Sequence, residues 1–263
     1  KKSVDRARKG HGPTVIESNV VRLFPHSSSD DHKKYRSEDD IEADKLKDPI
    51  LILRDTCVKR KIATKSELEK IDTDMFNLVN ESTDWAETQE NPDSAKPLKN
   101  LYGPGQEFMD KPNVEKDRIV LVDAINHALD EELTHNPKAL IYGEDIAGGK
   151  GGVFTATRGL TDKHGKDRVF NSPLAESSIV GTAIGLSTLG YKPIVEIQFG
   201  DYIWPAFMQI RNEMSTMRYR SNGDWSCPFV IRVPVGGYIH GSLYHSQSID
   251  GYFTHIPGIR VAF

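Results

Sequence analysis

The chain has 263 residues, 27% of them charged, and carries a formal net charge of −4. This length suits one large domain or two ordinary ones, and the balance of charge argues against a basic nucleic-acid-binding surface. Cys57 and Cys227 are too few for a disulfide framework and favour a reducing, cytoplasmic setting. No apolar run reaches about 18 residues, so we expect no membrane-spanning segment.

The first part of the chain, residues 1–87, predicts a mainly helical region. The stretch "PTVIES" at 13–18 indicates a short strand, and a polar segment rich in Ser, Asp and Lys follows it at 25–45. Residues 49–62, "PILILRDTCVKRKI", predict a helix or a helix-like segment. The polar segment is typical of a solvated loop, although a mobile loop that contains a histidine also gates many active sites.

A second, amphipathic helix is predicted over residues 63–87, because apolar side chains recur there every three or four positions. Thr64 and Glu67 have the spacing of a capping box at its start. Residues 88–116 carry four prolines and little periodic signal, which is typical of a linker.

Beyond residue 117, helical and strand patterns alternate. We expect helices at 118–137, 177–190 and 202–220, and strands at 139–145, 192–199, 228–237 and 258–263. This order predicts an α/β fold, in which a parallel sheet has helices on both faces. Ligands of such folds bind beyond the carboxyl ends of the strands. Because the chain lacks an initiator methionine and stops inside a predicted strand, we expect both ends to be cuts through a longer protein.

Three strand-end loops are candidates for a site. "GEDIAGGKGG", at 143–152, has glycines that would let a backbone approach phosphate, but its spacing fits a loop that merely shapes a site better than a phosphate loop. In "GGYIHGSLYHSQS", His245 is an acid–base candidate, or a loop histidine bonded to a neighbour. In "QFGDYIWPAF", Tyr202 and Trp204 offer a stacking face, or belong to the core.

One carboxylate, Glu176, lies in "NSPLAESSIVG" at the start of a predicted helix of small residues. A carboxylate in a first helical turn interacts favourably with the helix dipole. That interpretation explains the charge of Glu176, but it does not explain the apolar residues directly before it.

Taken together, these motifs resemble one family. "GEDIAGGKGGVF", "RVFNSPLAESSIVGTAIGLSTLGYKPIVEIQFGDYIWPAF" and "GSLYHSQS" are similar to the β subunit of the thiamine-diphosphate-dependent 2-oxoacid dehydrogenases. "HSSSDDHKKYR" is similar to the active-site loop near the end of their α subunit. The chain thus resembles a fused α–β decarboxylating component. Residues 1–87 correspond to the C-terminal part of an α-type subunit, 88–116 to a linker, and 117–263 to a β-type pyrimidine-binding domain truncated at its end.

The resemblance implies oxidative decarboxylation of 2-oxoacids on thiamine diphosphate, with transfer of the acyl group to the lipoyl arm of a partner acyltransferase. "YHSQS" and "RYRSN" favour the branched-chain, 2-oxoisovalerate type. A pyruvate-type enzyme and a non-catalytic assembly module stay open as alternatives. The resemblance also implies a homodimer of the fusion or an α2β2-like assembly, without a nucleic-acid or membrane partner.

The family also implies roles for cofactor-binding residues. The glutamate at the position of Glu176 hydrogen-bonds a ring nitrogen of the cofactor's aminopyrimidine, and we expect the apolar residues before it, with Leu174, to shield it from water. Tyr202 matches the position that packs on this ring, and Gln198 is expected to line the pocket.

Histidines of the family move protons, and His26 and His245 match these positions as further catalytic residues beside Glu176. Other loop positions, expected to order the site or dock the lipoyl domain, are Arg22, Ser27, Asp30, Asp31, Tyr35 and Arg36. The chain has no "GDG"-type motif for magnesium and the diphosphate. We therefore expect no metal ligand here, and an anchor for magnesium and diphosphate in a part absent from this sequence.

Overall fold

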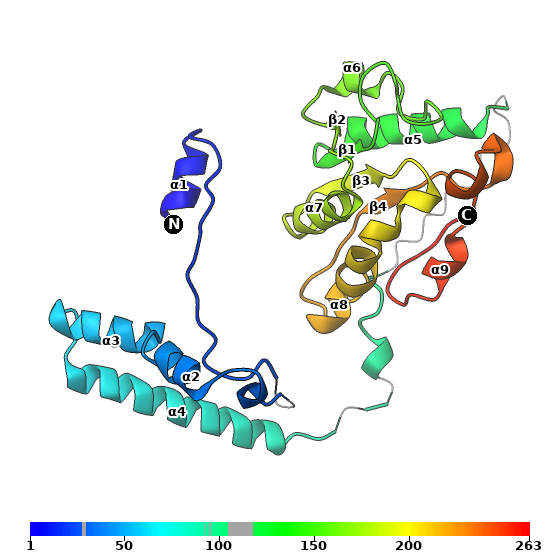
Figure 1. Cartoon of the computed structure of the whole chain (residues 1–263). Helices are drawn as coiled ribbons and strands as arrows, with labels where there is room; N and C mark the ends of the chain where they lie inside the picture. Colours follow the sequence, from blue (N-terminus) through cyan, green and yellow to red (C-terminus); the bar gives the residue numbers. More distant parts are fainter. Residues whose placement is uncertain (28–29, 92, 95, 105–117) are drawn as a thin grey trace. The chain divides into compact units, whose positions relative to one another are not determined.

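The computed structural model describes residues 1–27, 30–91, 93–94, 96–104 and 118–263, and divides into two compact units, 1–91 and 92–263 (Figure 1). The described residues of the first unit form helices and no strand. These helices are α1 (Lys2–Arg8), the 3₁₀ turn η1 (His32–Lys34), α2 (Glu38–Lys45), α3 (Pro49–Lys59) and α4 (Lys65–Glu87). Part of the predicted linker, 105–116, lies outside the described residues.

The predicted start of α4 is confirmed in detail. The Oγ1 atom of Thr64 accepts a hydrogen bond from the backbone N–H of Glu67 at 3.2 Å, and the Glu67 carboxylate accepts one from the backbone N–H of Thr64 at 2.7 Å. This reciprocal pair satisfies two N–H groups that the helix itself leaves unpaired. The helix predicted at 49–62 is also confirmed, as α3, with Pro49 in its first turn, where proline needs no N–H partner.

The apolar faces of α3 and α4 have little cover. An ion pair of 2.6 Å between Arg54 and Asp72 connects the two helices, yet neither helix has a fully buried residue. Large apolar side chains that are more than half exposed include Ile50, Leu53, Ile71 and Phe76. An apolar helical face usually packs against a core, but in the described first unit these apolar side chains stay largely exposed.

The strand predicted at 13–18 is wrong. These residues run without helix or ladder, and Val15 is 96% exposed. A strand is stable only when a neighbour pairs with its backbone, and the described part of this unit contains no second strand. The short apolar, β-branched stretch alone could not reveal that the partner is missing.

The second unit is built on a parallel sheet, which confirms the predicted α/β fold. Its strands are β1 (Ala139–Gly143), β2 (Val169–Asn171), β3 (Lys192–Glu196) and β4 (Val230–Arg232), in the spatial order β2-β1-β3-β4. All three neighbouring pairs are parallel. The four carboxyl ends therefore share one edge of the sheet.

Helices cover both faces of this sheet, as predicted. Ala139 and Ile141 of β1 join a core with Leu129 and Leu133 of α5 (Leu121–His135). The adjacent Tyr142 of β1 joins a different core with Val195 of β3 and the helix α7 (Glu176–Thr188). Successive strand residues point to opposite faces, so α5 and α7 lie on opposite sides.

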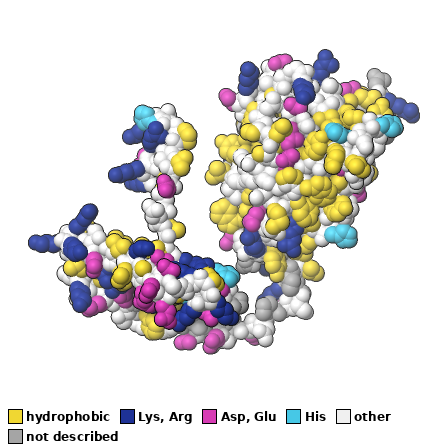
Figure 2. Space-filling view, viewed as in Figure 1, with side chains coloured by type: hydrophobic (Ala, Val, Ile, Leu, Met, Phe, Trp, Pro, Cys, Tyr) yellow, Lys and Arg dark blue, Asp and Glu magenta, His cyan; other side chains and the backbone are white. Residues whose placement is uncertain are grey.

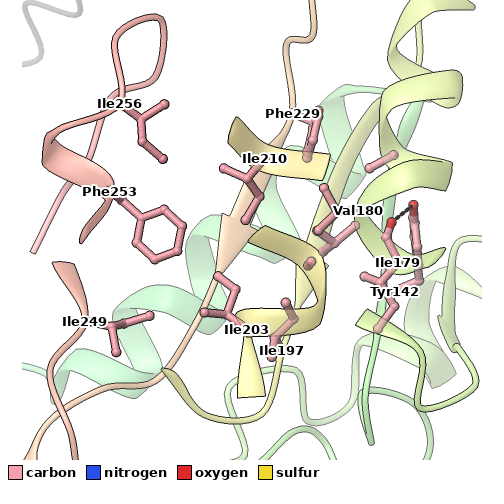
Figure 3. Packing of buried hydrophobic residues seen from close by; sticks show 13 residues of the cluster. Tyr142, Ile179, Val180, Ile197, Ile203, Ile210, Phe229, Ile249, Phe253 and Ile256 are labelled. Carbon is pink, nitrogen blue, oxygen red and sulfur yellow. Dashed lines mark hydrogen bonds between the residues drawn. The ribbon is translucent and has the colours of Figure 1, made fainter. Parts of the chain in front are cut away.

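The larger core holds the start of α7 in place. The Tyr142 hydroxyl donates a buried hydrogen bond of 3.0 Å to the carbonyl of Ile179, as Figure 3 shows. Tyr142 also stacks on Phe170 of β2, with ring centroids 5.1 Å apart. The hydrogen bond attaches the first turn of α7 to the central strand β1, and the ring contact joins β1 to its neighbour β2.

The helix predicted at 202–220 is broken into short pieces. They are η3 (Gly200–Tyr202), η4 (Trp204–Ala206), the π-helix η5 (Gln209–Met214) and α8 (Met217–Arg220). Pro205 lacks an N–H, and the hydroxyls of Ser215 and Thr216 bond backbone carbonyls four residues earlier. Each of these features disturbs a regular α-helical ladder.

Other short elements of the unit were not predicted, namely η2 (Lys96–Leu98), α6 (Leu160–His164), η6 (Gly237–Ile239), η7 (Ser242–Tyr244) and α9 (Asp250–Thr254). The strand predicted at 258–263 is wrong, because this segment pairs with no described strand. Gly258 instead packs against the backbone of Ser215, and Arg260 lies over the ring of Tyr102. Among the described helices, none combines the length and the apolar character needed to cross a bilayer.

Candidate active site

Three glutamates gather at the carboxyl edge of the sheet. Glu144 directly follows β1, Glu196 ends β3, and Glu176 begins α7, which follows β2. Glu144 and Glu196 are each only 1% exposed. The backbone N–H of Glu144 donates to the carbonyl of Glu196 at 3.2 Å, so the two acids are fixed side by side.

Glu176 is the group with an available carboxylate. It is only partly buried, and its side chain makes no hydrogen bond among the described residues. The hydroxyl of Ser177, the next residue, donates to the carbonyl of Pro205 and so ties the start of α7 to η4. Leu174 is 77% exposed in this chain, and the expected shielding of Glu176 by Leu174 stays a prediction.

Glu144 is a candidate site residue that the sequence did not reveal. Its Oε2 atom accepts a hydrogen bond of 3.1 Å from the backbone N–H of Gln198, and its Oε1 atom is buried without a partner among the described residues. Burial raises the pKa of the Glu144 carboxyl, the Gln198 N–H lowers it, and the negative charges of Glu176, Asp145 and Glu196 raise it further. The only signal was an acid directly after an apolar strand.

Glu196 is held by a cation. The Nε atom of Arg232, at the end of β4, donates to Oε2 of Glu196 at 2.8 Å, and the Nη2 atom donates to the same oxygen. Burial raises the pKa of the Glu196 carboxyl, while the guanidinium of Arg232 lowers it. The pair joins two neighbouring strands at the edge where the site lies.

The glycine-rich loop after β1 is fixed by its own contacts. The Asp145 carboxylate accepts hydrogen bonds from Lys150 and from the side chain of Gln198, which therefore points toward the loop. The backbone N–H of Ala147 donates to Asn171 at 2.8 Å, and that of Gly152 to the carbonyl of Asp145 at 2.9 Å. Because these N–H groups are already used, the loop is better suited to shape a site than to bind phosphate.

His245 and Tyr202 form a second group on the same edge. The Tyr202 hydroxyl lies 2.7 Å from Nε2 of His245, and both rings meet Phe199 edge to face. His245 also lines a pocket of about 170 Å³ with Phe154, Phe199 and residues 234–236, 238 and 239. His245 is thus hydrogen-bonded to a neighbour, as one of the two interpretations expected. That neighbour is Tyr202, itself a predicted site residue.

The first unit contains the other predicted site residues, arranged around Asp30. Its Oδ2 atom accepts hydrogen bonds from the Tyr35 hydroxyl at 2.6 Å and from the backbone N–H of His26 at 3.2 Å, and lies 2.8 Å from Nδ1 of His26. The hydrogen bonds of Tyr35 and His26 hold the pKa of Asp30 at about 2. Arg22 donates to the Tyr35 hydroxyl at 2.8 Å and completes the chain of contacts.

The remaining loop residues support this network. Arg36 donates to the carbonyl of Arg22 at 2.9 Å and pairs with Asp44 of α2 at 2.5 Å. The Asp31 carboxylate accepts the backbone N–H of Lys33 and caps η1, and the Ser27 hydroxyl lies 3.5 Å from Nε2 of His26. Residues 28 and 29 of this motif lie outside the described residues. Among those described, no three His, Cys, Asp or Glu side chains are grouped as metal ligands.

A parallel sheet with acids and an aromatic pocket beyond its strands defines a ligand-binding α/β domain. Residues 117–263 match the family model described as "Transketolase, pyrimidine binding domain", and the chain belongs to this family. Residues 1–95 match a second model, described as "Dehydrogenase E1 component".

Curated relatives are similar over about half of the chain. The chain is 51% identical over 140 residues to the 2-oxoisovalerate dehydrogenase subunit beta of Bacillus subtilis, which covers 53% of this chain and 42% of the relative. It is 51% identical over 148 residues to the mitochondrial 2-oxoisovalerate dehydrogenase subunit beta of Dictyostelium discoideum. This match covers 56% of this chain and 40% of the relative. The beta subunit of the pyruvate dehydrogenase E1 component from Leifsonia xyli is 44% identical over 151 residues, covering 57% and 44%. The chain thus spans about two fifths of the length of these relatives.

Proposed function

We propose that this chain is part of the decarboxylating component of a thiamine-diphosphate-dependent 2-oxoacid dehydrogenase, acting on branched-chain 2-oxoacids of the 2-oxoisovalerate type. The two relatives at 51% identity carry the 2-oxoisovalerate name, whereas the pyruvate dehydrogenase relative is 44% identical, and these values support the substrate class. The observation that carries the proposal is the available carboxylate of Glu176 at the start of α7, inside the matched domain.

We further propose that the chain joins two subunit types. In this proposal, residues 1–87 are the C-terminal part of an α-type subunit, 88–116 a linker and 117–263 a β-type domain. The presence of two family matches in one chain, at 1–95 and 117–263, supports a fusion. The cytoplasmic location expected from the sequence stays a prediction.

The residues of the sheet edge fit the pyrimidine half of thiamine diphosphate. Glu176 offers a carboxylate that no described protein group occupies, which suits a basic ring nitrogen. Tyr202 and Phe199 supply aromatic surface nearby, and Gln198 and Leu174 complete the proposed lining. The described residues offer no comparable set for magnesium and the diphosphate. We propose that this anchor lies in another part of the assembly.

When bound, thiamine diphosphate supplies a carbon nucleophile and an electron sink for decarboxylation. In the proposed mechanism, Glu176 holds and releases a proton at one carboxylate oxygen, opposite the ring nitrogen. Negative charge on Glu176 is one cause of the raised pKa of the buried Glu144 carboxyl, so the two acids are electrostatically coupled. His26 and His245 move protons at their Nε2 atoms while the substrate reacts.

The proposed partners are a lipoyl-bearing acyltransferase and further copies or subunits of the enzyme. We assign docking of the lipoyl domain to the loop of Arg22, Ser27, Asp30, Asp31, Tyr35 and Arg36, where the side chain of His26 is 65% exposed. A homodimer or an α2β2-like assembly is supported by the hydrophobic side chains that gather on the visible face of the second unit (Figure 2). Exposed areas of this kind are typical of contact surfaces.

The test uses the complete protein that contains this chain. We expect thiamine-dependent decarboxylation of 3-methyl-2-oxobutanoate to be faster than that of pyruvate, and Glu176→Gln to reduce kcat at least a hundredfold, the scale of a lost general acid–base group. Glu131→Gln, on the exposed side of α5, is the matched control and should leave the rate unchanged. Faster turnover of pyruvate would favour that substrate instead. Full activity of Glu176→Gln would favour a non-catalytic assembly module.

A further inference from the structure

The contact between Tyr202 and His245 joins two loops that are far apart in the sequence. Tyr202 is the last residue of η3, after β3, and His245 follows η7, after β4. The Tyr202 hydroxyl and the His245 Nε2 atom are 2.7 Å apart, which is a short hydrogen bond. Both side chains are half-buried, so water competes only partly for this contact.

The other nitrogen of the ring defines the direction of this hydrogen bond. Nδ1 of His245 lies 3.2 Å from the carbonyl oxygen of Gly241. A carbonyl oxygen only accepts, so Nδ1 must carry a hydrogen. In the neutral ring Nε2 is therefore the acceptor, and the Tyr202 hydroxyl is the donor.

The orientation of the ring is fixed as well. Phe199 meets the ring of His245 edge to face, with centroids 4.7 Å apart. A Cβ atom added to Gly241 would lie 2.3 Å from Cβ of His245, so only glycine leaves room for this position. Gly241 has a φ of −83°, which any residue adopts, so the requirement is for space alone.

We propose that Tyr202 is a positioning residue, whose hydroxyl holds His245 in the Nδ1–H tautomer with Nε2 as its basic atom. This role is additional to the ring packing expected of Tyr202. It rests on the proposed function, in which His245 transfers protons. The single lone pair of Nε2 then accepts the Tyr202 hydrogen, so a proton reaches Nε2 only when this hydrogen bond opens or relays it. Without the Tyr202 hydroxyl, the weaker contact of 3.2 Å between Nδ1 and the Gly241 carbonyl would be left to favour this tautomer.

The experiment is NMR of the full chain with ¹⁵N-labelled histidine, since two-bond and three-bond ¹H–¹⁵N correlations distinguish the two neutral tautomers. His245→Gln identifies the signals of His245 among the nine histidines. We expect the Nδ1–H pattern in the wild-type chain and a mixture of tautomers in Tyr202→Phe. Tyr244→Phe is the control, because this neighbouring tyrosine is 66% exposed, and it should keep the wild-type pattern.

A second variant tests the same hydrogen bond by moving the histidine instead of removing the tyrosine hydroxyl. Gly241→Ala should displace the ring and also mix the tautomers, although Tyr202 is intact. An unchanged Nδ1–H pattern in Tyr202→Phe, or an Nε2–H pattern in the wild-type chain, would overturn the proposal.

Activity of the complete protein is a separate readout. Tyr202→Phe should lower kcat/KM for the 2-oxoacid about fivefold, as expected for one neutral hydrogen bond. If His245→Gln kept full activity, the proposed proton transfer by His245 would fail, while the NMR result would still decide the role of Tyr202.

Discussion

The ion pair between Glu196 and Arg232 gives a prediction of stability. Glu196 has a side chain only 2% exposed, and Arg232 is 19% exposed. Replacing Arg232 by Met keeps the length of the side chain but leaves a buried carboxylate without its cation. Removal of one partner of a buried pair costs about 3–5 kcal/mol, and the partial exposure of Arg232 favours the lower end of this range. Since domains unfold with about 5–15 kcal/mol, a loss of about 3 kcal/mol is large.

Urea unfolding followed by tryptophan fluorescence measures this loss, because Trp204 and Trp225 lie in the second unit. The control is Arg220→Met, which removes a 2.6 Å pair between Arg220 and Glu213, both about half exposed. Exposed pairs contribute about 0–1 kcal/mol, so this variant should stay close to wild type.

The dependence on pH follows from the raised pKa of the Glu196 carboxyl. Without Arg232, which lowers that pKa, the pKa rises further, and a protonated Glu196 needs no cation. The loss of stability in Arg232→Met should therefore be largest at neutral pH and shrink in mild acid. Adding Glu196→Gln should recover much of it. Equal losses in Arg232→Met and Arg220→Met, or a loss independent of pH, would refute the reasoning.

Two further predictions concern a glycine and the loop of the first unit. Gly143→Ala should destabilise the chain by about 1–3 kcal/mol in the same unfolding assay, because its Cβ would lie 2.1 Å from the carbonyl oxygen of Glu196. The exposed helical Gly185→Ala should instead be neutral or slightly stabilising, and an equal loss there would contradict the steric argument. Asp30→Asn removes the carboxylate that contacts His26, so NMR at neutral pH should show that the His26 side chain is no longer held in one position. In the wild-type chain the contact between Asp30 and His26 is fully present above the ordinary carboxyl pKa. It is lost as the pH falls through about 2, the folded-state pKa of Asp30.

The helices and strands predicted correctly are those with a clear apolar run or an apolar residue every three or four positions within the segment. The apolar runs of β1 and β3 and the periodic faces of α4 and α5 were all found, because these patterns depend on the segment itself. The strands expected at 13–18 and 258–263 failed because pairing depends on a distant partner. β2, with three residues, is too short to show a period.

The candidate site was predictable to a similar extent. Glu176 was singled out because a helix start after an apolar segment is visible in the sequence. Glu144 was missed, since an acid after a strand looks like a solvated turn until the fold buries it. The contact of Tyr202 with His245 spans 43 positions, and no local pattern indicates which two loops meet.

The uncovered apolar faces of α3 and α4 have a thermodynamic consequence. A partner that covers them removes apolar surface from water, so its association should show a negative change in heat capacity. The same binding would stabilise the folded first unit by mass action, and its melting temperature would rise with the concentration of the partner. The stability of these two helices is then a property of the assembly rather than of the isolated chain.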